Sequence, residues 1–260
     1  VLGSMIHGMT VPGSIEAAQR ARGLTKGMFE WLRKAPWGNP AFAGMFMSLV
    51  FFGFIGGISG VVMGTEQINL IMHNTLYVPG HFHGTVVAGT TLAFMAITYY
   101  LVPLIFRREL MFMKLAKLQP YVFGIGVAGI SVFMMGAGTL GVSRRHWDMQ
   151  FADAVLPFDY PSAAFLMMGL NGMFAVLAAL GGIMFVVVVV GSVFFGRKLA
   201  RDEKPSYPEV PPQAAVVAEH GSAHTLKIPG TTMLVAIFFI AFVLYYFVNW
   251  KYLSEVWPLS

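Results

Sequence analysis

Cysteine is missing from this chain of 260 residues. Its absence excludes disulfide bonds, thiolate metal sites and cysteine nucleophiles, so a bound metal ion must be held by histidine, methionine or carboxylate side chains. Charged residues are also scarce, at 11% of the chain. Soluble domains contain about 25% charged residues, so this composition excludes an ordinary water-soluble surface.

Hydrophobic residues are abundant instead, at 57% of the chain, and the mean hydropathy is +0.68. We therefore predict an all-α fold, a polytopic transmembrane helix bundle. Apolar runs indicate five full spans, at residues 42–64, 76–106, 118–142, 162–195 and 228–250. Each run is long enough to cross a hydrocarbon layer of about 30 Å.

Two further segments complete the expected organisation of residues 1–260 as a single membrane domain. Residues 1–15 form a shorter apolar stretch, which we interpret as a partial N-terminal span, the tail of a helix cut from a longer chain. The stretch lacks the basic n-region and cleavage site of a signal peptide. Residues 202–225 are rich in Pro, Ala and Glu, a composition that predicts a flexible cytoplasmic loop.

Lys and Arg are divided unequally between the two sides of the predicted bundle. Of these 17 basic residues, all but Arg144, Arg145 and Lys251 fall in loops on one side. The positive-inside rule places that side in the cytoplasm of a cell inner (plasma) membrane and the loops of His73 and Arg144 in the periplasm. Orientation in membrane lipid accounts for the net charge of +5, so we expect no nucleic-acid partner.

Two histidines, His81 and His83, lie inside one apolar run. A helix turns by about 100° per residue, so positions i and i+2 project about 200° apart. Imidazole is costly in hydrocarbon unless its nitrogens are bonded, and iron is a natural partner for it. One helix could therefore ligate two different metal centres.

An arginine pair, Arg144 and Arg145, begins the loop at the outer end of the third span, against the positive-inside bias. Arginine suits bidentate contacts with carboxylates, and the propionates of a haem standing edge-on in the membrane would supply them. His73 and Asn74 lie on the same side and could add hydrogen bonds.

The residues alone leave structural alternatives open. The histidines could be hydrogen-bonded packing residues, although Gly80 and Gly84 are expected to clear space around them. The arginines could bind lipid phosphates or pair with Asp148 and Asp153, and His73 could be a solvated loop residue.

The sequences HNTLYVPGHFH at residues 73–83 and GVSRRHWD at residues 141–148 together resemble subunit I of the haem-copper oxidase superfamily, most closely its B-type, ba3-like branch. The resemblance spans essentially the whole chain, from the family's eighth helix to a thirteenth. It implies that His81 is the proximal ligand of the high-spin haem and His83 an axial ligand of the low-spin haem. Phe82 lies between them and, with His81, is assigned to catalysis.

The same resemblance implies further cofactor contacts and partners. Arg144, Arg145 and His73 match the family's propionate-contacting residues, and we add Asn74 and Asp148 to the cofactor-binding set. The A-type branch has a magnesium-binding aspartate where this chain has Asn74, so we expect no magnesium.

The ligands of the family's copper ion, copper B, lie on earlier helices. They would come from the N-terminal part of subunit I or from a separate chain. The other implied partners are a subunit II-like electron-entry subunit with a copper centre, and cytochrome c or another periplasmic donor.

The function implied is that of a terminal oxidase, which reduces oxygen to water with electrons passed between two haems and pumps protons. Three alternatives remain open at this point. They are a nitric oxide reductase of the same superfamily, a haem-free membrane scaffold and a transporter with broken helices.

Overall fold

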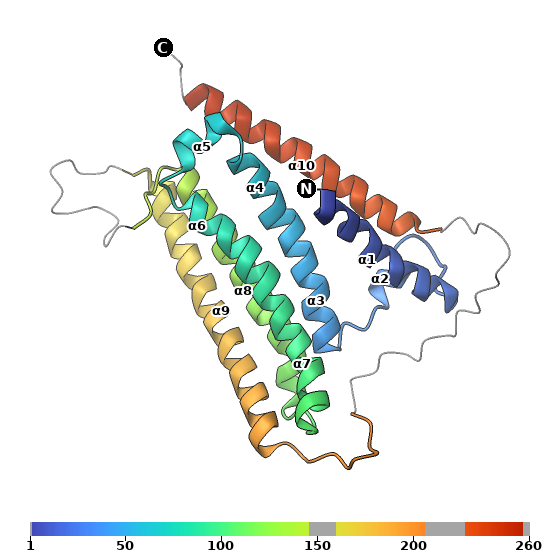
Figure 1. Cartoon of the computed structure of the whole chain (residues 1–260). Coiled ribbons are helices and arrows are strands. Elements are labelled where there is room, and N and C mark those ends of the chain that lie inside the picture. Colours follow the sequence, from blue (N-terminus) through green and yellow to red (C-terminus); the bar gives the residue numbers. More distant parts are fainter. Residues whose placement is uncertain (1, 146–159, 206–226, 257–260) are drawn as a thin grey trace.

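The computed structural model describes residues 2–145, 160–205 and 227–256, and most of this part of the chain is helical. The exceptions are turns and two isolated antiparallel bridges, Thr75 with Ser143 and Arg108 with Lys198. Figure 1 shows long helices packed side by side, with the chain reversing direction at each connection. Five helical segments of the described chain are long and apolar enough to cross a membrane, which confirms the predicted polytopic bundle.

The helices occur in the following order. They are α1 (Leu2–Ala21), α2 (Glu30–Arg33), α3 (Pro40–Phe51), η1 (Phe52–Gly57), α4 (Ile58–Met63), α5 (Glu66–Met72), α6 (Tyr77–Phe82), η2 (His83–Thr91), α7 (Leu92–Phe106), α8 (Met113–Thr139), α9 (Ser162–Phe195) and α10 (Pro229–Val256).

Local sequence explains where several of these helices begin and end. Asn39 caps α3, because its Oδ1 accepts hydrogen bonds from the backbone N–H groups of Ala41 and Phe42 at 2.9 and 3.1 Å. Helix α8 ends at Thr139, and Gly141 follows with a φ of +89°, the left-handed conformation that glycine adopts at helix ends. The predicted bounds of α9 match those of the structure.

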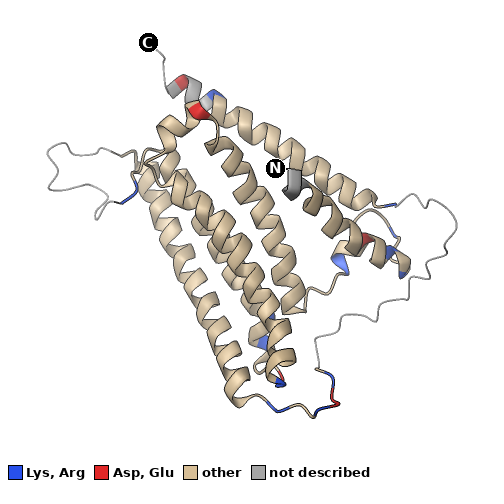
Figure 2. Cartoon of the chain, viewed as in Figure 1, with Lys and Arg blue, Asp and Glu red and all other residues tan. Residues whose placement is uncertain are grey.

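The third span was predicted to begin at residue 118, but α8 begins at Met113. The helix includes Lys114 and Lys117, which lie outside its apolar part. Figure 2 shows that Lys and Arg gather at helix ends and in connections, while the long middle parts of the helices carry other residues.

Two of the spans are interrupted by π-helical turns, which the sequence analysis did not predict. Segment η1 separates α3 from α4, and η2 separates α6 from α7. The two π segments pack directly against each other, and a Cβ atom added at Gly56 would lie only 2.5 Å from Cγ2 of Thr85. Such π turns are frequent at functional sites, and here one of them begins at His83.

Helix α8 packs closely against both α6 and α9 through small residues. A Cβ atom at Gly126 would lie 2.5 Å from the backbone nitrogen of Ala178 on α9, and one at Gly138 would lie 2.0 Å from that of Tyr77 on α6. This is the small-residue surface through which membrane helices approach each other. It fixes α6, which carries His81, against the best-buried helix of the bundle.

Helix α10 lies along α1 and the upper part of α4 in Figure 1. At its beginning, the backbone of Gly230 and Thr231 donates hydrogen bonds to the carboxylate of Glu16 on α1. Further along α10, the hydroxyl groups of Tyr245 and Tyr77 lie 3.1 Å apart. Helix α10 is thus attached to the rest of the bundle by polar contacts at its beginning and within its length.

Candidate functional site

His81 lies in the last turn of α6, half-buried, with its ring against α4. Its Nδ1 atom is 2.9 Å from Oγ of Ser59. A Cβ atom at Gly60 would lie 2.9 Å from Cε1 of His81, so the missing side chain at Gly60 makes room for the imidazole. Two neighbouring residues of α4 therefore define where this ring sits.

His83 is the first residue of η2 and is also half-buried. Its Nδ1 atom lies 2.7 Å from the backbone carbonyl oxygen of Pro79, one turn earlier on the same helix. A carbonyl can only accept a hydrogen bond, so Nδ1 carries the proton and Nε2 keeps its lone pair. Because Nδ1 is held in this way, Nε2 is the nitrogen suited to bind a metal.

Each histidine thus has a hydrogen bond at Nδ1, with Ser59 for His81 and with Pro79 for His83, and the backbone carbonyl of Gly56 is a further partner of His81. Metal-binding histidines usually have this arrangement, in which one nitrogen is fixed by the protein and the other binds the metal. That the two rings leave their helix on opposite sides stays a prediction from the helical repeat.

The loop after α8 is joined to the loop before α6 by the bridge between Thr75 and Ser143. Next to it, the backbone N–H of Arg144 donates to the carbonyl of Asn74 at 2.9 Å, and Nη2 of Arg144 lies 3.4 Å from Oδ1 of Asn74. The structure therefore brings together Asn74 and Arg144, which are far apart in the sequence.

Arg144 and Arg145 border a hollow of about 380 Å³ beside α6, which is otherwise lined by Leu76, Val78, Pro79, Phe82 and Met134. Arg145 adopts a left-handed backbone conformation with a φ of 65° and is exposed. The lining combines apolar side chains with two arginines, a combination that suits a flat apolar group with acidic substituents.

The remaining predicted site residues are Phe82, His73 and Asp148. Phe82 is 53% exposed and borders the hollow, and its ring centroid lies 5.5 Å from that of His81. His73 is exposed, and its backbone N–H donates to the carbonyl of Asn69 at 2.8 Å. Asp148 lies outside the described residues, as does most of the predicted loop at 202–225.

Gly80 and Gly84 were predicted to clear space around the two histidines, and this prediction was wrong. A Cβ atom at Gly80 would press on Met135 of α8, and one at Gly84 would press on Ile55 and Ser131. These glycines let neighbouring helices approach, and Gly60 on α4 is the glycine that gives His81 its space. The sequence analysis missed Ser59 and Gly60, although a hydroxyl and a glycine side by side in an apolar run were a possible signal.

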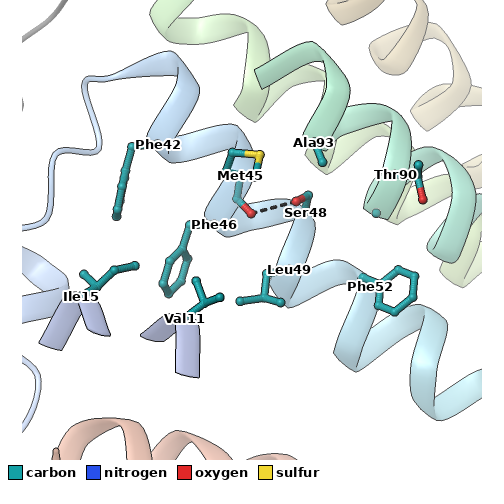
Figure 3. A pocket seen from close by; sticks show the side chains of 11 residues that line it. Val11, Ile15, Phe42, Met45, Phe46, Ser48, Leu49, Phe52, Thr90 and Ala93 are labelled. Atoms are coloured by element: carbon teal, nitrogen blue, oxygen red, sulfur yellow. Dashed lines mark hydrogen bonds between the residues drawn. The ribbon is translucent and has the colours of Figure 1, made fainter. Parts of the chain in front are cut away.

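A second hollow, also of about 380 Å³, lies between α1, α3 and the helix formed by η2 and α7. Figure 3 shows apolar side chains from all three lining it, among them Val11, Phe46 and Ala93. The hydroxyl of Ser48 donates to the carbonyl of Met45 at 2.8 Å. Among the described residues, those that line this hollow have no ionisable side chain.

Comparisons with known proteins show which proteins this chain is similar to. Residues 2–170 match the family model described as cytochrome c and quinol oxidase polypeptide I. The chain is 35% identical over 221 residues to cytochrome c oxidase subunit 1 of Thermus thermophilus, which covers 83% of this chain and 36% of that protein. It is also 36% identical over 103 residues to cytochrome c oxidase polypeptide 1 of Halobacterium salinarum, covering 38% of this chain and 17% of that protein.

Among solved structures, the chain is similar to one in the cryo-EM structure of a heme-copper terminal oxidase dimer. The TM-score is 0.69 and the sequence identity 29%, over 95% of this chain and 42% of that chain. The chain therefore spans well under half the length of these relatives.

Proposed function

The chain belongs to the cytochrome c and quinol oxidase polypeptide I family, and on that basis we propose that it forms part of the catalytic subunit of a respiratory terminal oxidase. Such an enzyme reduces oxygen to water with electrons from a periplasmic donor. The observation that carries the proposal is the pair of half-buried histidines on one helix, each with Nδ1 held by the protein.

The side chains fit the two haems that this family implies. Nε2 of His81 would bind the high-spin haem and Nε2 of His83 the low-spin haem, since Nδ1 of each ring is already engaged. When bound, the haems would supply the electron carrier and the iron at which oxygen reacts. The protein holds the two rings at fixed positions along one helix, with Phe82 between them.

Arg144 and Arg145 would neutralise the propionates of a haem at the outer end of the bundle, where they border the hollow beside α6. The Oδ1 atom of Asn74 holds the guanidinium of Arg144 in this loop. Asp148 and His73 are the two further residues that we assign to this end of the cofactor site.

Several parts of the proposal lie outside this chain. The copper ligands would come from the N-terminal part of subunit I or from a separate chain, and a subunit II-like partner with its own copper centre would deliver electrons from cytochrome c or another donor. The proposed orientation in the plasma membrane puts the Arg144 loop in the periplasm and most Lys and Arg residues in the cytoplasm. Protons from the cytoplasmic side would be consumed and pumped.

The experiment is to purify the complete complex that contains this chain and to measure oxygen and nitric oxide consumption with a reduced donor. We expect oxygen consumption that is lost in His81→Ala. A complex that consumes nitric oxide in place of oxygen would support the reductase of the same superfamily. A complex that contains no haem would support a scaffold and contradict the proposal.

A further inference from the structure

Ser59 is a fully enclosed hydroxyl group at the start of α4, just after the π turn η1, and 1% of its surface is exposed. Its Oγ atom contacts three polar atoms. These are the carbonyl oxygens of Ile55 and of Gly56, the latter at 3.0 Å, and Nδ1 of His81 at 2.9 Å.

The one proton of the hydroxyl links the directions of these contacts. A hydroxyl has one proton to donate, and carbonyl oxygens can only accept. The Ser59 hydroxyl is oriented to donate to the carbonyls of Ile55 and Gly56, and in that arrangement its oxygen is the acceptor toward His81. The proton in the contact with His81 then belongs to Nδ1, which leaves the lone pair of that ring on Nε2.

The surroundings of the ring explain why this hydroxyl can reach it. The π turn brings the carbonyls of Ile55 and Gly56 to the same hydroxyl, and Gly60 leaves the space that the imidazole occupies. The ring of His81 is therefore held in position by α4, on which neither predicted metal ligand lies.

We infer that Ser59 is a positioning residue for His81, which fixes its tautomer and raises the basicity of Nε2 toward the iron of the high-spin haem. This inference rests on the proposed function, because it requires His81 to be the ligand. A hydrogen bond accepted from the distal N–H of a metal-bound histidine strengthens the ligand, and loss of such a partner typically lowers metal affinity about 10-fold to 100-fold.

The test is Ser59→Ala in the purified complete complex, with resonance Raman measurement of the iron–histidine stretching band of the reduced high-spin haem. We expect the band to move to lower frequency and the reduction potential of this haem to rise. Retention of the high-spin haem should fall about 10-fold, the lower end of the range, because the carbonyl of Gly56 remains as an acceptor near the ring. Ser59→Thr, which keeps the hydroxyl, should restore the band, and the low-spin haem should be unchanged.

Ser131→Ala is the matched control. Its Oγ atom is also buried and donates to a carbonyl beside the motif, that of Gly80 at 2.6 Å, without contacting the ring of His81. We expect this variant to leave the iron–histidine band in place. If Ser131→Ala shifts the band as far as Ser59→Ala does, the effect is general loosening of packing and the inference is wrong.

Gly60→Ala provides a second variant if Ser59→Ala does not accumulate, because its Cβ atom would press on Cε1 of His81 while the hydroxyl stays. We expect it to shift the same band, and an unchanged band would overturn the inference. A complex that loses its high-spin haem in His81→Ala but keeps the wild-type band in Ser59→Ala would overturn the inference alone. Retention of that haem in His81→Ala would overturn the proposed function as well.

Discussion

Two kinds of polar group in this bundle differ in their hydrogen-bond partners. One is the carboxylate of Glu16, near the end of α1, and the other is the pair of imidazoles of His81 and His83. Glu16 is 0% exposed, and its oxygens accept four hydrogen bonds, from Nε of Arg20, the backbone N–H groups of Gly230 and Thr231, and Oγ1 of Thr231. Burial raises the pKa of this carboxyl, but the hydrogen bonds from Thr231 and Arg20 outweigh it and hold the pKa below its ordinary value.

Each of the two histidines has a hydrogen bond at Nδ1, and we propose that Nε2 of each binds iron. The comparison teaches that the Glu16 cluster holds α10 to α1 with groups of the chain itself, whereas we propose that the site at His81 and His83 is completed by haem. Changes at Glu16 should therefore alter the stability of the fold. Changes at His81, His83 and Arg144 should alter the properties of the cofactors. The following variants test this separation.

The largest effect is expected at the packing of α6 on α8, because this contact supports both the stability of the bundle and the position of His81. Gly138→Ala would place Cβ 2.0 Å from the backbone nitrogen of Tyr77, and backbone cannot move aside as a flexible side chain can. We expect a loss of about 3 kcal/mol or more, so that little folded complex with haem is recovered in size-exclusion chromatography. Gly172→Ala on α9 is the control, because nothing lies within 4 Å of its added Cβ. Equal recovery of both variants would contradict the packing seen here.

Glu16→Ala should cost about 3 kcal/mol, because it removes the acceptor of Nε of Arg20 and of the first N–H groups of α10. Thermal denaturation of the complex should show a lower Tm, with unchanged haem spectra in the remaining folded protein. Glu255→Ala is the control, because it removes an exposed carboxylate of α10 and should leave Tm unchanged. A haem spectrum altered in Glu16→Ala would break the proposed separation.

Low pH should weaken the contact between the Glu16 carboxylate and α10. Because the folded pKa of Glu16 lies below its ordinary value near 4.5, its contribution to stability is present above that value and is lost as the pH falls through the folded pKa. Glu16→Gln should remove this part of the acid dependence.

Arg144→Ala should act on the cofactor and leave the fold intact. Loss of a charged hydrogen bond to a propionate costs about 1.5 kcal/mol, and loss of the positive charge makes reduction of the nearby haem less favourable. We expect a lower haem reduction potential in spectroelectrochemical titration, and a smaller change in Arg144→Lys, which keeps the charge. An unchanged potential in both variants would indicate that the arginine binds another anion, such as a lipid phosphate.

Arg197→Ala should have the smallest effect. Arg197 pairs with Glu109 and Glu203 at the end of α9, and these hydrogen bonds hold the pKa of both carboxyls below the ordinary range. The side chain of Arg197 is 54% exposed, so water and salt weaken the pairs. A small decrease in Tm at low salt should disappear at high salt, and a decrease that persists would show that this network is structurally important.

The sequence was sufficient to predict the fold class and the spans, because long apolar runs leave few alternatives in a membrane. It also placed Asn74 and Arg144 on one side of the membrane, and the structure brings them into contact. The π turns η1 and η2 were not predictable, because they depend on how one helix packs against another. The same holds for Ser59 with His81 and for Glu16 with Thr231, since these pairs are contacts between separate helices.

The most direct test of the central claim is the reduced-minus-oxidised absorption spectrum of the purified complex with His81 or His83 changed to alanine. We expect the wild-type complex to show high-spin and low-spin haem bands, His81→Ala to lose the high-spin band and His83→Ala to lose the low-spin band. Two variants that both keep both bands would contradict the assignment of these histidines as haem ligands.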